Sequence, residues 1–313
     1  MNQKSDRKFL SSMWISPNDS LFEKEKSEIG NAWDRSKPWD RYSDIEEGAG
    51  LPVFRKRFGS ASKKPVKCVI YATALGNFEL FMNGQRVGKK TGNSVKYDEL
   101  KPGWTDYSKR TLYYTYNLTP FLAEEGQNCI IAPVSNGWYQ GRISFNSYGT
   151  HKVAFNAVLE IEYEDGSKET LTTGTDWDVK LTGPVLAADI WDGEVYDATK
   201  VTFEELSMPG KRTNGWVKAQ KYDDFNGIVT KNVGPAIRVR RINMKPLTLT
   251  RYSNVEAVDG TDFGKIIVDE IVKKPKAVML KKGETFIYDM GQNMVGWVNF
   301  TVSGKKGTRL TAR

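Results

Sequence analysis

The sequence predicts an all-β protein built around an antiparallel β-sandwich. Short segments rich in β-branched and aromatic residues recur along the chain, with turn residues between them. Helical periodicity is nearly absent. An Asn83-Gly84 pair separates two such segments, and Asn-Gly is the preferred two-residue hairpin turn because both positions need positive φ angles. A chain of 313 residues has room for two domains of ordinary size.

The first 50 residues form a polar, Trp-rich segment that we expect to be partly irregular. Its compact apolar cluster is residues 13–17. Residues 21–26 follow the capping group Asn18-Asp19-Ser20, which predicts one helical turn.

Residues 51–203 carry the strongest strand pattern and are predicted to form the first β-sandwich domain. Strands are expected at residues 53–58, 66–72, 78–82, 85–88, 110–116, 129–134, 154–163 and 168–173. The turn at residues 164–167 makes the last two a hairpin. The apolar residues near the end of the segment 154–163 would not all face the same side of a regular strand, because Val158 is at an even position and Ile161 and Tyr163 are at odd positions. This indicates either a β-bulge or a mixed burial pattern.

The strand pattern breaks at residues 204–236, which we interpret as a connection centred on residues 207–216. Strands resume in residues 237–313, at 237–242, 248–252, 285–289 and 297–302, which predicts the start of a second β-sandwich. Residues 308–313 have the pattern of a strand that is cut short. We therefore expect this chain to be a fragment of a longer protein.

Composition and charge exclude several classes of protein. No run of about 18 apolar residues is present, so no membrane span is predicted. The net charge of +8 comes from lysines and arginines scattered in short groups, whereas nucleic-acid binding needs a clustered stripe. The basic N-terminus lacks the apolar core of a signal peptide, which leaves open a cytoplasmic protein or an exported form, periplasmic or secreted, whose signal was removed.

Cysteine and histidine usage argues against a metal site. Cys68 and Cys129 each lie inside a predicted buried strand, and two free thiols are favoured over a disulfide between neighbouring strands. His151 is the only histidine and is predicted to be a loop residue. We predict no metal and no cofactor.

Residues 136–142 are the first candidate site. They follow the apolar segment 128–134 and place Asn136, Trp138, Tyr139 and Arg142 around two glycines. An aromatic ring stacks on the apolar face of a sugar while amide and charged groups bind its hydroxyls, so these four residues are carbohydrate-binding candidates. The alternative is structural: Trp138 caps the core, and Arg142 pairs with an acidic residue of the group that follows.

The densest acidic group is the second candidate. Asp189, Asp192, Glu194 and Asp197 lie close in sequence, and glycoside hydrolysis uses two carboxylates. Odd- and even-numbered residues of one strand face opposite sides of the sheet, however, so these carboxylates would not all meet on one face. Asp192-Gly193 is also typical of a turn. We therefore predict no catalytic residue here, and retain Asp192 and Glu194 as candidates for contact with sugar.

The order of five segments resembles a known family. Residues 72–88, 102–107, 136–142, 191–198 and 289–297 are similar to the successive signatures of the N-terminal region of bacterial α-L-rhamnosidases, glycoside hydrolase family 78. The resemblance implies a galactose-binding-like jelly roll for the first domain. It also implies a C-terminal (α/α)6 catalytic domain of the same polypeptide, which removes terminal α-L-rhamnose with inversion.

On this resemblance the catalytic residues lie after Arg313, so the chain itself is a non-catalytic part that supports the barrel and helps to bind a rhamnose-containing glycan. Two alternatives remain: an independent rhamnose-binding module, and a purely structural interdomain module. Some members of the family use such a module as a calcium-dependent lectin, but Leu75-Gly76 is apolar where calcium needs oxygen donors. The link at residues 91–100, between the Asn83-Gly84 hairpin and Pro102-Gly103-Trp104, is longer than in the family. Residues 254–274 have the character of an insertion. Gly291-Gln292-Asn293 is expected to be a loop whose amides hydrogen-bond the backbone.

Overall fold

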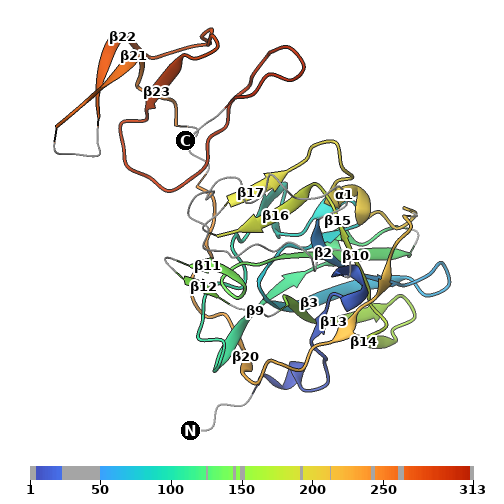
Figure 1. Ribbon diagram of the computed structural model, residues 1–313. Helices are drawn as coiled ribbons and strands as arrows, with labels where there is room; N and C mark the ends of the chain where they lie inside the picture. Colours follow the sequence, from blue (N-terminus) through green and yellow to red (C-terminus); the bar gives the residue numbers. More distant parts are fainter. Residues whose placement is uncertain are drawn as a thin grey trace. The chain divides into compact units, whose positions relative to one another are not determined.

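The computed structural model describes residues 5–22, 50–124, 126–143, 146–148, 152–190, 193–211, 213–240, 244–259 and 264–310. The chain divides into two compact units, Met1–Arg238 and Val239–Arg313, which are described separately (Figure 1). Strands dominate both units, and the helical segments are single turns. None of the described helices has the length and apolar character needed to span a membrane.

The first sheet of the first unit has seven strands in the order β19-β1-β13-β3-β9-β20, with β14 paired to β13 outside that path. β20 runs parallel to β9, and the other pairs are antiparallel. The strands are β1 (Ile15–Ser16), β3 (Pro65–Leu75), β9 (Arg110–Asn117), β13 (Ala154–Tyr163), β14 (Lys168–Thr172), β19 (Gln220–Lys221) and β20 (Ile228–Lys231).

The second sheet also has seven strands, in the order β18-β15-β2-β10-β5-β6, with β4 paired to β10. Its strands are β2 (Leu51–Phe58), β4 (Asn77–Phe78), β5 (Phe81–Met82), β6 (Gln85–Arg86), β10 (Asn128–Ser135), β15 (Asp178–Thr182) and β18 (Val217–Lys218). Three two-stranded ribbons complete the unit: β7 (Lys89–Thr91) with β8 (Ser94–Lys96), β11 (Gly141–Ile143) with β12 (Asn146–Tyr148), and β16 (Val185–Asp189) with β17 (Gly193–Tyr196).

Aromatic side chains from both sheets meet in the core of the first unit. Phe155 of β13 stacks on Phe54 of β2, with ring centroids 5.8 Å apart, and contacts Phe78 and Trp177 at 5.9 Å. All four rings are at most 2% exposed. Burying a side chain of this size stabilises a fold by about 1.5–3 kcal/mol. The predicted all-β sandwich is confirmed.

Local predictions in this unit hold where turn chemistry decides the backbone. Asn83 and Gly84 have φ angles of +49° and +83° and join β5 to β6. β13 and β14 form the second predicted hairpin, and the register between β13 and β3 shifts at Glu162/Tyr163, so a bulge is present. Cys68 and Cys129 are buried free thiols, as expected.

Other predictions need correction. The strand expected at residues 78–82 is split into β4 and β5, because the Phe78 amide turns aside to donate to the Lys101 carbonyl at 2.9 Å. The helical turn expected at 21–26 is a 3-10 turn at Asp19–Phe22, and residues 23–26 lie outside the described part. The long link at residues 91–100 is occupied in part by the β7–β8 ribbon.

Residues 204–236, expected as a connection, contribute to the first unit. The single turn α1 (Phe203–Leu206) begins at Thr202, whose side chain forms a capping box with Glu205. β18, β19 and β20 then pair with strands of the two sheets, while residues 207–216 are free of strand where the structure describes them. The expected division of the chain into domains after residues 50, 203 and 236 stays a prediction.

A buried group of charges lies beside Tyr116, near the end of β9. The Lys101 ammonium is 1% exposed and donates to both carboxylate oxygens of Glu79 at 3.0 Å. Asp98 is fully buried at its side chain and accepts from Tyr116 at 3.0 Å and from Arg238 at 2.7 Å. Each buried charge therefore has an opposite partner, which is the condition for burying it.

The second unit is a three-stranded sheet in the order β22-β21-β23. Its strands are β21 (Thr248–Ala257), β22 (Gly264–Lys273) and β23 (Thr285–Asp289). Residues 254–274, expected as an insertion, supply the end of β21 and the whole of β22.

The strands predicted at residues 237–242 and 297–302 are wrong where the structure describes them. Ile237 makes only an isolated bridge to Glu99, residues 238–240 and 297–302 have no strand, and residues 241–243 lie outside the described part. Residues 308–310 also have no strand. A strand needs a neighbour to bond its backbone groups, and the described residues supply none for these segments.

Candidate functional site

The candidate loop at residues 136–140 is a tight turn directly after β10. The Asn136 carbonyl accepts from the amides of Tyr139 at 3.3 Å and Gln140 at 3.1 Å. Gly137 has a φ of +54°, and a Cβ there would lie 2.5 Å from the Asn77 nitrogen. The turn therefore closes against β4 only with glycine at this position.

The turn presents Trp138 to a second tryptophan that the sequence reasoning did not select. Trp138 stacks on Trp104, with ring centroids 5.6 Å apart and planes 18° apart. Trp104 is 61% exposed, and Trp138 is partly buried. We call these two rings the tryptophan face. The signal that could have found Trp104 was its place in the Pro102-Gly103-Trp104 segment, already noted as a motif.

An open hollow of about 420 Å³ adjoins the tryptophan face. It is lined by Trp104, Thr105, Asp106, Lys109 and Arg110. The side-chain hydrogen bond from Lys109, followed by that from Ser108, lowers the pKa of Asp106 to about 2. Asp106 is therefore an ionised acceptor at neutral pH. An exposed indole next to a carboxylate and two cations provides apolar and polar contacts in one place.

Tyr139 points to a different set of partners from Trp138. Its ring makes an edge contact with Tyr107 at 5.1 Å, and its hydroxyl shares a hydrogen bond with the Tyr222 hydroxyl. Burial raises the pKa of all three tyrosines. Tyr139 thus attaches the turn to Tyr107 and Tyr222, whereas Trp138 supplies the aromatic surface that the turn contributes to the tryptophan face.

A polar atom below the turn lacks a partner. The side-chain oxygen of Asn77 is buried and accepts no hydrogen bond from the described residues. A Cβ added at Gly137 would come within 2.8 Å of the Asn77 amide carbon, so this side chain lies directly against the turn. Asn77 is a second residue that the sequence reasoning did not select as a site residue.

The structure brings together only part of the predicted site. Asn136, Trp138 and Tyr139 share the turn, whereas Arg142 lies on β11 with its backbone paired to Ser147. The Arg142 side chain, Asp192 and His151 lie outside what the structure describes, so the proposed pairing of Arg142 stays a prediction.

Glu194 belongs to the separate β16–β17 ribbon, opposite Ala188. It has no hydrogen bond or ion pair with any described residue. The residue is exposed as a whole, yet burial of its carboxyl raises the pKa. Its role in binding sugar stays a prediction.

Within the described ranges, no group of three or more His, Cys, Asp or Glu could hold a metal ion. Leu75 is fully buried in the core, and the Gly76 backbone packs against the Ser135 carbonyl. At Gly291, the backbone amide donates to the Asp289 carboxylate at 2.7 Å, and the expected bonding of the loop's amides to the backbone stays a prediction.

Comparison with known families decides which fold family this site belongs to. Residues 63–241, more than half of the chain, match the model of the α-L-rhamnosidase N-terminal domain. The chain belongs to the α-L-rhamnosidase N-terminal domain family. Residues 280–313 also match the bacterial α-L-rhamnosidase concanavalin-like domain.

Relatives of this rhamnosidase N-terminal domain are larger proteins. An α-L-rhamnosidase of Streptomyces avermitilis is 33% identical over 293 residues, which cover 92% of this chain and 24% of that protein. The chain thus spans about a quarter of the length of the curated relatives it matches.

Two solved structures are similar in fold and sequence. The Streptomyces avermitilis α-L-rhamnosidase complexed with L-rhamnose has a TM-score of 0.54 and 26% identity, covering 78% of this chain and 26% of that one. The native Aspergillus terreus enzyme has a TM-score of 0.56 and 26% identity, covering 83% and 26%.

Proposed function

We propose that this chain is the non-catalytic N-terminal part of an α-L-rhamnosidase and that its tryptophan face contacts a rhamnose-containing glycan. The observation that carries the proposal is the stacking of the exposed Trp104 on the partly buried Trp138 beside a polar hollow. L-Rhamnose has a methyl group and C–H faces that stack on an indole, and hydroxyls that donate to a carboxylate such as Asp106.

The hydrolysis itself is proposed for another part of the same polypeptide. An (α/α)6 domain would supply the carboxylic acid that protonates the leaving oxygen and the carboxylate that activates water, which gives inversion. The N-terminal units would support that domain and hold the glycan near it. Sequence similarity to α-L-rhamnosidases over nearly the whole chain supports this assignment.

The test follows tryptophan fluorescence of the purified chain during titration with L-rhamnose. We expect a saturable change in the millimolar range that disappears in both Trp104→Ala and Trp138→Ala. Trp297→Ala is the matched control, because Trp297 is 74% exposed but lies in the second unit. If the wild-type signal stays flat at tens of millimolar sugar, the binding role is wrong.

A separate assay tests the non-catalytic assignment. The chain alone is incubated with a chromogenic α-L-rhamnoside, and we expect no release of the chromophore above the buffer rate. Hydrolysis that co-purifies with the chain would contradict the proposal.

The purely structural alternative makes the opposite prediction for the same variants. Tyr139 is held by Tyr107 and Tyr222, which favours a packing role for that half of the turn. If the turn only packs, Trp138→Ala lowers the free energy of unfolding and L-rhamnose leaves the fluorescence of the wild type unchanged.

A further inference from the structure

A second hollow in the first unit lies apart from the residues of the tryptophan face. It has a volume of about 460 Å³ and is lined by Ser16, Lys152, Gln220, Lys221, Tyr222, Asp223 and Asp224. We call it the Ser16 pocket. Volumes of roughly 300–1,000 Å³ are typical of small-molecule sites, and nearly all of these lining residues are polar.

The hydroxyl of Ser16 is the unusual group in this pocket. Ser16 is 0% exposed, and its Oγ has no hydrogen-bond partner in the described part of the chain. β1 pairs with β13 on one side and with β19 on the other, which fixes the backbone position of Ser16 in the sheet. Leaving a buried hydroxyl unpaired costs free energy, so a group beyond the described residues that bonds it would be stabilising.

The charges around the pocket favour a neutral ligand. Lys221 pairs with Asp223 at 2.6 Å, and Lys152 pairs with Asp19, so neither ammonium is left to hold an anion. Asp224 is exposed and has no ion pair or hydrogen bond with any described residue. Two lysines next to the carboxylates also disfavour a metal cation. A ligand with hydroxyl groups suits an unpaired carboxylate and an unpaired serine hydroxyl.

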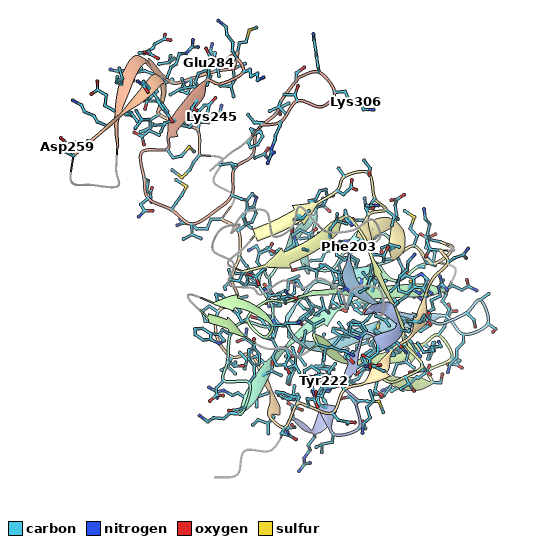
Figure 2. All side chains as sticks on the ribbon, in the orientation of Figure 1. Phe203, Tyr222, Lys245, Asp259, Glu284 and Lys306 are labelled. Carbon is cyan, nitrogen blue, oxygen red and sulfur yellow. The ribbon has the colours of Figure 1, made fainter. Side chains whose placement is uncertain are left out.

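Tyr222 joins this pocket to the loop of the tryptophan face. Tyr222, which is labelled in Figure 2, lines the pocket, and its hydroxyl shares a hydrogen bond with the hydroxyl of Tyr139, the residue after Trp138. Burial raises the pKa of both tyrosines, so both hydroxyls stay protonated at neutral pH. A hydrogen bond between two protonated tyrosines therefore connects a residue that lines the Ser16 pocket with the turn that carries Trp138.

We propose that the Ser16 pocket is a second carbohydrate subsite, which binds a neutral sugar unit through the Ser16 hydroxyl and the Asp224 carboxylate. One sugar hydroxyl donates to Asp224, and another exchanges a hydrogen bond with Ser16. This site goes beyond the tryptophan face and does not need it, because the two share no lining residue.

The experiment records amide spectra of the ¹⁵N-labelled full chain during titration with L-rhamnose, D-glucose and sodium D-galacturonate. The backbone amides of Ser16, Gln220 and Tyr222 report the pocket, and the indole N–H signals of Trp104 and Trp138 report the tryptophan face. We expect the neutral sugars to shift the pocket amides saturably. Asp224→Asn should weaken that binding about tenfold and Ser16→Ala about threefold, with the indole responses unchanged.

Two controls make the result specific. Asp165→Asn removes an exposed carboxylate that bonds the Ser167 amide in the β13–β14 turn, and it should leave the pocket titration unchanged. Ser16→Ala should leave the thermal unfolding midpoint unchanged or raise it, because it removes an unpaired buried group.

Three outcomes would overturn the proposal. Pocket amides that do not move with any sugar at 100 mM exclude the subsite, and a response to galacturonate alone excludes a neutral ligand. A clear fall in the unfolding midpoint of Ser16→Ala shows that the hydroxyl already has a structural partner. The indole signals decide the role of the tryptophan face separately, so either site can fail while the other stands.

Discussion

β13 and β22 are both ten-residue strands, yet they lie in opposite surroundings, and only β13 was predicted as a strand from the sequence. In β13, eight of the ten residues are buried, whereas nine of the ten residues in β22 are exposed. β13 pairs with β1, β3 and β14 and faces the second sheet, while β22 pairs only with β21 among the described strands. Both segments form strands, but whether a strand is buried depends on the elements that cover it.

The two units differ in the same way. The first unit encloses an aromatic core between two sheets, whereas Leu249, at 1% exposure, is the one buried apolar residue among the described part of the second unit. Ile271, Val298 and Phe300 are 59%, 71% and 54% exposed. A three-stranded sheet with an uncovered apolar face has little to hold it against unfolding. We expect the first unit to be the more stable, and the predictions below test this difference.

The largest effect is expected from the core of the first unit. Phe155→Ala should lower the free energy of unfolding by about 3–5 kcal/mol, because it leaves a cavity among Phe54, Phe78 and Trp177. Phe300→Ala in the second unit is the matched control, with an expected change within about 0.5 kcal/mol. Denaturant unfolding followed by far-ultraviolet circular dichroism, which reports the strands of both units, measures both. Equal losses for the two variants would contradict the comparison.

The sequence carried enough information for the strands whose burial and turns are local. The β5–β6 and β13–β14 hairpins follow from Asn83-Gly84 and from the turn at residues 164–167, and the long apolar segment 128–134 predicted β10. These features hold because φ preferences and side-chain period act over a few residues. The segments 237–242 and 297–302 failed, since a strand pattern does not reveal whether a pairing neighbour exists.

The sequence predicted the turn of the candidate site but not the residues that contact this turn. The glycines and Trp138 marked residues 136–142 directly from sequence. The contacts to Trp104, 34 positions earlier, and to Tyr222, 83 positions after Tyr139, depend on how the sheets stack. Ser16 gave no signal, because an unpaired buried hydroxyl exists only once β1 is enclosed by β13 and β19.

A smaller effect is expected from the buried charges of the first unit. Lys101→Met removes the partner of Glu79, which keeps one hydrogen bond from Arg86 at 3.0 Å, so we expect a loss of about 1–3 kcal/mol. The control is Arg251→Met in the second unit, whose ion pairs to Glu270 and Glu284 are 3.9 Å long. Long, partly exposed pairs contribute about 0–1 kcal/mol. A loss for Arg251→Met as large as for Lys101→Met would remove the distinction between the units.

Acid should destabilise the first unit through Asp98. Burial alone would raise the pKa of Asp98, but hydrogen bonds from Arg238 and Tyr116 and the charge of Lys89 lower it below its ordinary value. A folded-state pKa below the unfolded one adds stability above the ordinary value of about 3.9, and that stability is lost as the pH falls through the folded pKa. We therefore expect the unfolding midpoint to fall with pH below about 4.

Asp98→Asn tests that assignment. The variant should be less stable than the wild type at pH 7, and the difference should narrow as the pH falls, since the wild type then loses the same charge. Calorimetric unfolding at several pH values between 7 and 3 measures both slopes. Parallel pH profiles for the two proteins would show that Asp98 is not the group responsible.

The smallest effect is expected from β22 itself. Val268→Ala, at a position that is 45% exposed, should change the free energy of unfolding by less than about 0.5 kcal/mol. Val158→Ala is the same substitution at a 2% exposed position of β13, and a loss of about 1–3 kcal/mol is expected there. Limited proteolysis should cleave the second unit first in the wild type and in both variants, because an uncovered sheet opens more often than an enclosed one. If Val268→Ala costs as much as Val158→Ala, β22 is covered in solution, and its exposed apolar residues are not a source of low stability.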